Sequence, residues 1–256
     1  SAASDVYKRQ EEHRQVRSSG GLFDVSHMGR IRFSGRDACR FLDRVCTRKI
    51  HGAAIGQARY TIICNERGGC LDDALVTRLD ESEYLMVCNA ANREKLLGHF
   101  AREKRDFVFK QVDQTLKTAM IALQGPRVMD VLSVFSSEIP ELKRYRSTTK
   151  SLLMAKFIMS RTGYTGEDGV EVILPALLAG KAVDMMLKNV ESAEVIKPCG
   201  LGARDSLRLE SGMALYGHEI DEDTDPLTAA LHFAVSLEKG IDLSLIHISE
   251  PTRQDR

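Results

Sequence analysis

The sequence predicts an α+β fold, in which short strands and amphipathic helices interleave and hairpins are common. Two observations carry this prediction: β-rich runs bounded by glycine-containing turns, and apolar residues at helical spacing between them. The chain has 256 residues, of which 43% are hydrophobic, and its 36 basic side chains balance its 36 acidic ones. This length and composition are typical of one large globular domain or two modest ones, and they exclude a disordered polyelectrolyte. The frequent hairpins favour α+β over a doubly wound parallel sheet.

The first half of the chain begins its regular pattern after Gly20-Gly21, which we take as a breaker. Ala38, Phe41, Leu42 and Val45 recur at helical spacing. A glycine-containing turn at 65–69 between two β-rich runs is typical of a hairpin. The predicted elements are a strand at 31–33, a helix at 38–45, hairpin strands at 60–64 and 74–77, a strand at 84–88 and a helix at 92–105.

The second half opens with a continuous apolar run at 119–123, which predicts a buried strand. Pro175 is expected to begin a helix, and Gly212 to end one. The predicted elements are a helix at 127–135, strands at 152–160 and 170–174, helices at 175–187 and 203–211, and a strand-like run at 233–237.

Both ends of the chain have a composition unlike the rest. Residues 1–10 and 243–256 resemble translated adapter sequence, so we assign them as non-native-looking tails and 11–242 as the native region. Ordinary frayed termini are the alternative.

Several classes of protein and site are not expected. A zero net charge argues against a nucleic-acid binder with a globally basic surface, and no apolar run is long enough to cross a membrane. The six cysteines form no C-x-x-C pair, so we expect reduced thiols and no metal, with a zinc site or disulfides assembled from distant residues as the open alternative. No G-x-G-x-x-G segment follows a strand, and no nicotinamide cofactor is expected.

Two polar segments in the first half are candidates for chemistry. Asp24, Ser26 and His27 are too close in sequence for an easy catalytic triad, and a polar turn that hydrogen-bonds the backbone is the favoured interpretation. Asp72 and Asp73 enter an apolar strand, so one carboxylate should face inward or into a cleft. A partly buried carboxylate is a candidate proton carrier or cation stabiliser, whereas turn chemistry is the alternative.

Two glycine-containing segments lie in the second half. The loop at 161–171 has three glycines that would allow close approach to a ligand, with Tyr164 and Glu171 as candidate contacts to a flat, amino-bearing heterocycle. A plain surface loop is the alternative. In the segment at 199–212, glycines open a helix whose N-terminus could bind an anion, and Arg204 would be a bidentate donor there. An ordinary solvated helix is the alternative.

In this order, the segments resemble the aminomethyltransferases of the glycine cleavage system, the T-protein family. The resemblance covers about 11–242 and rests on EEHRQVR, GLFDVSHMG, ARYTIICNERGG with LDDALV, VCNAANREK, IALQGP, RTGYTGEDGVE, GLGARDSLRLESGM and LYGHEIDEDTDP. It implies a folate-binding fold with mixed or antiparallel sheets in two intertwined lobes, one at about 47–117 and the other formed by the remainder, and a third, barrel-like lobe in the family.

The resemblance also implies an activity. The family transfers the one-carbon unit of an aminomethyl group on the lipoyl arm of the H-protein to tetrahydrofolate. Ammonia leaves and 5,10-methylene-tetrahydrofolate forms, without a metal or nicotinamide. By motif, Asp73 matches the catalytic position, Glu171 the position that pairs with the pterin and Arg204 a folate contact. Four further residues match pocket-lining positions: Tyr60, Asn89, Tyr164 and Met28.

The chain departs from the family pattern at both ends. A segment before EEHRQVR and a C-terminal barrel domain have no counterpart in the sequence, so we expect weak folate binding and poor turnover. The alternatives are the folate-binding domain of a sarcosine or dimethylglycine flavin oxidoreductase, a related folate-dependent demethylase, and a folate-binding relative in iron–sulfur cluster maturation. A cytoplasmic location is expected for a bacterial protein, and the mitochondrial matrix for a eukaryotic one.

Overall fold

The computed structural model describes residues 2–152, 155–188 and 190–239. The chain forms two compact units, and each contains one sheet. Unit 1 comprises Ser1–His27 and Thr115–Met213, and unit 2 comprises Met28–Gln114 and Ala214–Arg256. The predicted tail at 243–256 lies outside the described residues, whereas residues 2–10 belong to the first helix.

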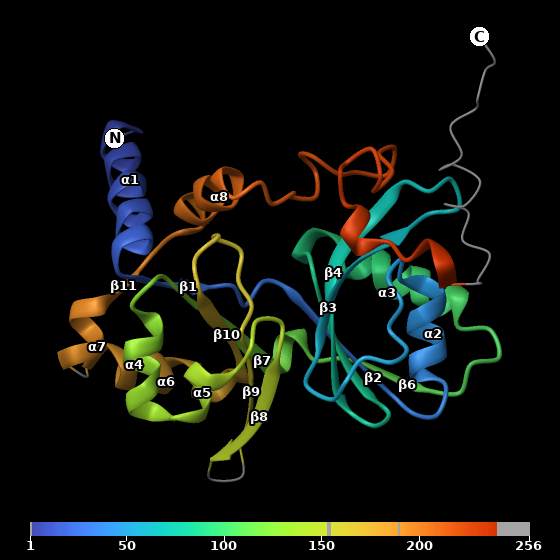
Figure 1. The fold of residues 1–256 in the computed structure, drawn as a ribbon, viewed down its shortest axis with the longest axis horizontal. Helices are drawn as coiled ribbons and strands as arrows, with labels where there is room; N and C mark the ends of the chain where they lie inside the picture. Colours follow the sequence, from blue (N-terminus) through green and yellow to red (C-terminus); the bar gives the residue numbers. More distant parts are fainter. Residues whose placement is uncertain (1, 153–154, 189, 240–256) are drawn as a thin grey trace. The chain divides into compact units, whose positions relative to one another are not determined.

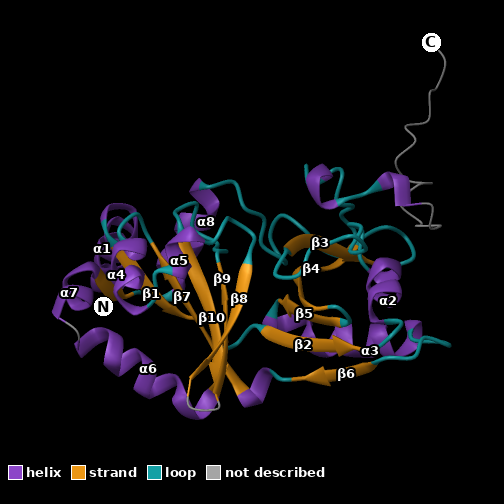
Figure 2. Ribbon diagram, turned by 60° about the horizontal axis from the view of Figure 1, so that its bottom comes forward, coloured by secondary structure: helices purple, strands orange, loops and turns teal. Residues whose placement is uncertain are grey.

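Unit 1 contains a six-stranded mixed sheet with the strand order β11-β1-β7-β10-β9-β8 (Figure 1). The pairing of β1 with β11 is parallel, and the other pairings are antiparallel. Helix α6 runs along this sheet and packs on β7 and β10 (Figure 2). The strands are β1 (Gly20–Asp24), β7 (Thr118–Gln124), β8 (Ser147–Leu152), β9 (Ala155–Ser160), β10 (Gly169–Pro175) and β11 (Ile196–Pro198). The helices are α1 (Ala2–Ser18), η2 (Thr115–Lys117), α4 (Val128–Phe135), α5 (Glu138–Glu141), α6 (Ala176–Lys188), α7 (Val190–Val195) and α8 (Leu201–Glu210).

Unit 2 contains a five-stranded antiparallel sheet with the order β3-β4-β5-β2-β6. Its strands are β2 (Gly29–Ser34), β3 (Ala58–Cys64), β4 (Cys70–Asp80), β5 (Glu83–Cys88) and β6 (Lys110–Asp113). Its helices are α2 (Ala38–Val45), η1 (Ala90–Asn92), α3 (Arg93–Glu103), η3 (His232–Ala234) and η4 (Leu237–Lys239). The predicted lobe at about 47–117 starts later than this unit, because β2 pairs with both β5 and β6.

The core of unit 2 explains why its helices form where the pattern predicts them. The four apolar residues of α2 are buried and share a hydrophobic cluster with Phe33 of β2 and Phe100 of α3. The rings of Phe33 and Phe100 meet edge to face, with centroids 5.6 Å apart. A second cluster contains Ile62 and Cys70 of the β3–β4 hairpin together with Ile220 and Leu231 from the C-terminal segment. That segment therefore covers the hairpin.

The structure corrects several sequence predictions. Gly20-Gly21 begins strand β1 instead of breaking the chain; a Cβ on Gly21 would meet Val16 Cγ2 at 2.5 Å, so glycine is required for close packing. The predicted strand at 152–160 is β9 together with the end of β8, and these strands form an antiparallel pair. Pro175 ends β10 instead of beginning α6. The run at 233–237 contains a 3₁₀ turn, not a strand. In the described part of the chain, no helix has the length and apolar character required to cross a membrane.

Candidate functional site

Strand β4 in unit 2 carries the carboxylate pair that the sequence singles out. An irregularity in the β3–β4 register lies just before this pair, since Cys64 is opposite Cys70 but Ile63 is opposite Asp72. Asp72 is fully buried, and Asp73 is half-buried. The prediction that one carboxylate faces inward is therefore confirmed.

Asn89, directly after β5, joins the two carboxylates. Its side-chain nitrogen lies 2.8 Å from Asp72 Oδ1 and 2.6 Å from Asp73 Oδ1, so one amide hydrogen can be donated to each. The backbone nitrogen of Asn89 and the side chain of Asn92 also donate to Asp72, at 3.0 and 2.6 Å. The Tyr60 hydroxyl donates to Asp73 Oδ2 at 3.0 Å. These hydrogen bonds hold both carboxylates in fixed positions.

Burial controls the protonation of this pair. It raises the pKa of Asp72 to about 7, assisted by the negative charge of Asp73 and opposed by the two asparagines. Burial also raises the pKa of Asp73, against the hydrogen bonds from Tyr60 and Asn89. Adjacent carboxyl groups titrate as a coupled pair, so this pair can hold a proton near neutral pH and still present a negative charge. Such an arrangement can accept a proton or stabilise a cation.

Two residues of unit 2 that match pocket-lining positions, Tyr60 and Met28, make further contacts. The ring of Tyr60 stacks on Phe233, with centroids 5.6 Å apart, and Phe233 is 60% exposed. Met28 is half-buried before β2, and its carbonyl accepts a hydrogen bond from Arg30 at 2.5 Å. Unit 2 thus contains four of the seven predicted site residues, and three of them, Tyr60, Asp73 and Asn89, form one hydrogen-bonded group.

Unit 1 contains the other three. Glu171 on β10 and Arg204 on α8 form a buried ion pair, with 3.6 Å between Oε1 and Nη2. Thr162 donates to the other carboxylate oxygen at 2.6 Å. The guanidinium carbon of Arg204 lies 5.1 Å from the centre of the Tyr164 ring. The predicted residues of this unit therefore lie together.

Arg204 has an unmet hydrogen-bonding capacity. Among the buried side-chain nitrogens and oxygens of the described residues, its Nη1 is the one without a hydrogen-bond partner. Burial lowers the pKa of Arg204, and the charge of Glu171 opposes this. An arginine keeps its charge under such conditions, and a buried donor without an acceptor costs about 1–3 kcal/mol. The geometry is suited to a ligand that supplies a carbonyl or carboxylate oxygen.

The glycines of the 161–169 loop have a different role from the predicted one. A Cβ on Gly163 would meet Gln124 Oε1 at 1.8 Å, and a Cβ on Gly169 would meet Gln124 Nε2 at 2.6 Å. Gln124 is fully buried and donates to the carbonyls of Leu123 and Thr162. These glycines therefore make room for the protein's own glutamine, so the expectation that they admit a ligand is wrong for these two positions.

The N-terminus of α8 also differs from the prediction. The backbone nitrogen of Gly200 donates to the Glu12 carboxylate at 2.9 Å, so an internal acidic side chain takes the predicted place of an external anion. In the first polar segment, the backbone nitrogen of Ser26 donates to Asp24 at 2.9 Å. The hydroxyl of Ser26 is 3.3 Å from the Met120 carbonyl. The interpretation of this segment as a polar turn is confirmed.

One group of side chains in the described residues has the composition of a metal site. Ligand atoms of Cys39, Asp43 and His51 lie within 4.8 Å of one another. However, Asp43 already accepts hydrogen bonds from the backbone nitrogens of Ile50 and His51. Burial raises the pKa of the Cys39 thiol above its ordinary value. The local chemistry therefore favours a role in which Asp43 hydrogen-bonds helix α2 to the loop that follows it.

Sequence reasoning missed some of the residues that build these groups. Asn92, Thr162 and Gln124 hold functional side chains or loops in place, and no role was predicted for them, although each lies in a segment that carries the family resemblance. The segment EEHRQVR contributed to the family resemblance with no role predicted for its side chains, but Glu12, His13 and Arg17 contact α8 or the residue before it. Their placement on one side of a helix was the available signal.

Comparisons with known proteins identify the family of this chain. Residues 4–239 match the family described as "GCVT N-terminal domain". A protein from Rubrobacter xylanophilus named aminomethyltransferase is 47% identical over 89% of this chain and 60% of its own length. An aminomethyltransferase from Exiguobacterium sibiricum is 42% identical over 88% of this chain and 61% of its own length.

A solved structure has the same fold. The crystal structure of glycine cleavage system aminomethyltransferase T from Bartonella henselae superimposes with a TM-score of 0.82 at 34% identity, covering 90% of this chain and 62% of that one. The chain thus spans about three fifths of the length of these relatives. Because the family region covers nearly the whole chain, the chain belongs to the aminomethyltransferase family of the glycine cleavage system.

Proposed function

We propose that the protein containing this chain transfers the one-carbon unit of an aminomethyl group from the lipoyl arm of an H-protein to tetrahydrofolate. Ammonia is released, and 5,10-methylene-tetrahydrofolate is the product. Family membership supports the class of reaction. The proposed partners are the lipoylated H-protein and the folate, and the proposed location of a bacterial form is the cytoplasm.

The Asp72–Asp73 pair is the observation that carries this proposal. Transfer of an aminomethyl carbon to an amine passes through an electron-poor carbon bonded to nitrogen. A carboxylate held by Tyr60 and Asn89 can stabilise that positive charge without reorganising. We assign this role to Asp73, because it is the less buried of the two. Asp72 would then carry the proton that the pair holds near neutral pH, which leaves the negative charge on Asp73.

The buried ion pair of unit 1 supports recognition of the folate. A pterin presents N–H donors to a carboxylate and a flat ring to an aromatic side chain, and Glu171 and Tyr164 have these chemistries. The unpartnered Nη1 of Arg204 calls for an acceptor atom, and a reduced folate carries carbonyl and carboxylate oxygens. We propose Glu171, Tyr164 and Arg204 as folate-binding residues.

Asp73→Asn provides the main test. The substitution keeps the size of the side chain and its hydrogen bond from Tyr60, but removes the negative charge. Aminomethylated lipoyl carrier is mixed with tetrahydrofolate and the variant, and loss of the carrier's aminomethyl group is followed by mass spectrometry. We expect the rate to fall by about a hundredfold or more, since removal of one preorganised electrostatic group typically has that effect.

Asp80→Asn is the matched control, because Asp80 is exposed at the end of the same strand. It should leave the rate unchanged. Undiminished transfer in the Asp73 variant would remove this residue from the reaction. Failure of the full-length protein containing this chain to bind 5-formyl-tetrahydrofolate in calorimetry would contradict the assignment of the unit 1 residues.

A further inference from the structure

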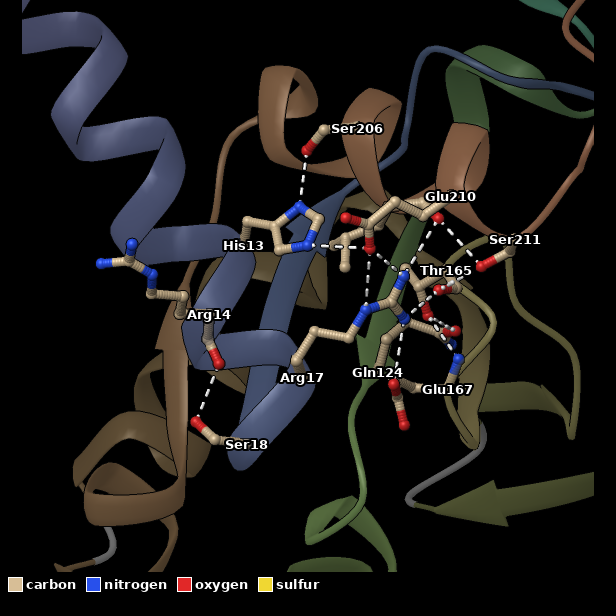
Figure 3. Close-up of polar contacts among 11 residues, drawn as sticks. His13, Arg14, Arg17, Ser18, Gln124, Thr165, Glu167, Ser206, Glu210 and Ser211 are labelled. Atoms are coloured by element: carbon tan, nitrogen blue, oxygen red, sulfur yellow. Dashed lines mark hydrogen bonds and ion pairs between the residues drawn. The ribbon is translucent and has the colours of Figure 1, made fainter.

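The last two turns of α1 carry polar side chains that the proposed reaction does not use. Arg17 is central among them (Figure 3). Its Nη1 donates to the Thr165 carbonyl at 2.6 Å and to Glu167 Oε1 at 2.9 Å. Its Nη2 donates to Glu210 Oε2 at 2.9 Å and to the Leu207 carbonyl at 3.3 Å. One guanidinium therefore bonds both to the 161–169 loop and to the last turn of α8.

Other residues of α1 add contacts along α8. The His13 Nδ1 atom lies 2.7 Å from the Ser206 hydroxyl, and its Nε2 atom lies 3.1 Å from Glu210 Oε2. Glu12 accepts the backbone nitrogen of Gly200 at the start of α8. The two helices are thus bonded at the first, middle and last turns of α8, and Figure 3 shows His13 and Arg17 directed toward it.

Ser211, which follows α8, completes the network. Its hydroxyl lies 2.9 Å from the Thr165 carbonyl and 2.9 Å from the Leu207 carbonyl, the same two carbonyls that accept from Arg17. Gly166 has a φ of +83°, and a Cβ there would meet the Ser211 hydroxyl at 2.1 Å. Arg17 therefore joins the loop and the helix, and the Ser211 hydroxyl, which has one proton, donates to either of the same two carbonyls.

These hydrogen bonds hold residues that lie close in sequence to Tyr164 and Arg204, the residues proposed to contact the ligand. Thr165 follows Tyr164 directly, and Leu207 lies one helical turn after Arg204. Tyr164 and Arg204 contact each other ring to guanidinium, at 5.1 Å, yet they come from separate elements. Their mutual position depends on how the loop and α8 are joined. A planar guanidinium has donors on two terminal nitrogens and can span two separated acceptor groups, whereas a lysine presents all its donors from a single nitrogen.

We propose that Arg17 is a positioning residue for ligand binding in unit 1, acting by fixing the loop that carries Tyr164 against the helix that carries Arg204. The inference rests on the proposed function only for the identity of the ligand. Its structural part, that Arg17 restrains the loop, stands independently of that identity.

Arg17→Met tests the proposal, because it keeps a long apolar stem and removes every donor. Arg14→Met is the matched control on the same helix; Arg14 is exposed, and Figure 3 shows its side chain directed away from α8 and the loop. Arg17→Lys keeps the positive charge but loses the planar group with donors on two terminal nitrogens. Amide hydrogen exchange is measured across 163–167 and 207–211 in the free chain, and binding of 5-formyl-tetrahydrofolate is measured by calorimetry.

In Arg17→Met we expect exchange in both segments to accelerate about tenfold and folate affinity to fall about tenfold, the range expected for lost charge-assisted hydrogen bonds. Exchange in β7 should be unchanged in all variants, which separates local positioning from loss of the fold. Arg17→Lys should recover only a small part of the exchange protection and of the affinity. Arg14→Met should match the unchanged chain.

The outcomes separate the two proposals. Unchanged exchange in both segments of Arg17→Met overturns the positioning role. Faster exchange with unchanged folate affinity overturns it as well, since the restrained loop would then be irrelevant to binding. If the unsubstituted full-length protein binds no folate, the proposed function fails, and the exchange data alone decide whether Arg17 restrains the loop.

Discussion

Glu171→Gln tests the energetics of the buried ion pair in unit 1. The two charges are 3.6 Å apart, which corresponds to an attraction of about 5 kcal/mol at an effective dielectric constant of about 20. Glutamine keeps the shape, but its single amide oxygen can face either Thr162 or Arg204, so the change removes the counter-charge of Arg204 and one acceptor. Breaking a buried pair from one side typically costs about 3–5 kcal/mol. We expect unit 1 to lose about 3 kcal/mol of unfolding free energy, because the amide dipole retains part of the interaction.

The assay is native-state hydrogen exchange of the slowest amides in β7 and β10, which reports the opening free energy of this unit alone. Arg204→Met and the double variant complete a thermodynamic cycle, and their coupling energy should be at least about 2 kcal/mol. Glu138→Gln is the control: Glu138 pairs with Lys150 at the surface, so its loss should cost less than about 1 kcal/mol. A loss below about 1 kcal/mol in Glu171→Gln, or additive effects in the double variant, would refute the assignment of a strong buried pair.

Three further predictions concern unit 2. The pKa of Asp72 is about 7 in the folded chain, above its unfolded value, so its stabilising contribution is present below about pH 4 and is lost as the pH rises through 7; denaturant unfolding over this range should show the decline, and Asp72→Asn should flatten it. If stability still declines over this pH range in Asp72→Asn, groups other than Asp72 cause the decline. Tyr60→Phe should raise the pKa of Asp73 further, since the hydroxyl donates to its charged form; carbon NMR titration measures this, and a lower pKa would contradict the hydrogen bond. Gly69→Ala would bring a Cβ within 1.7 Å of the Glu222 carbonyl, so urea unfolding should show a loss of more than about 2 kcal/mol; near-normal stability would contradict that close approach.

Local sequence patterns predicted the elements whose burial is periodic. Helix α2 is an example, because its four apolar residues face one cluster and their spacing alone identifies that face. The β3–β4 hairpin is another, since its turn chemistry and its β-rich strands agree. Gly20-Gly21 was misassigned because the reason for these glycines is a neighbour, Val16, that touches them only in the folded chain.

Site residues were predictable where a family motif identified them. They were less predictable where their role depends on a contact with a residue distant in sequence. Asp73, Glu171 and Arg204 were all named in advance, as were Tyr60 and Asn89, but the hydrogen bonds among them and the contact from Thr162 were not. Gln124 is separated by 38 residues from Thr162, to which it donates. Arg17 is 193 residues from Glu210. Periodicity indicates which side of an element is buried, and it contains no information on which distant atom meets it.

Hydrogen-bond satisfaction separates buried polar residues that build the fold from those that face a ligand. The side chain of Gln124 is satisfied on both sides, by two carbonyls and by the Thr165 hydroxyl. Arg208 is also buried, and its guanidinium donates to Asp205 and to the Met213 carbonyl. Arg204 lies one turn earlier on the same helix, yet its Nη1 finds no acceptor among the described residues. Since a fold-building arginine has its donors met internally, the unmet donor of Arg204 favours an acceptor that arrives with the substrate.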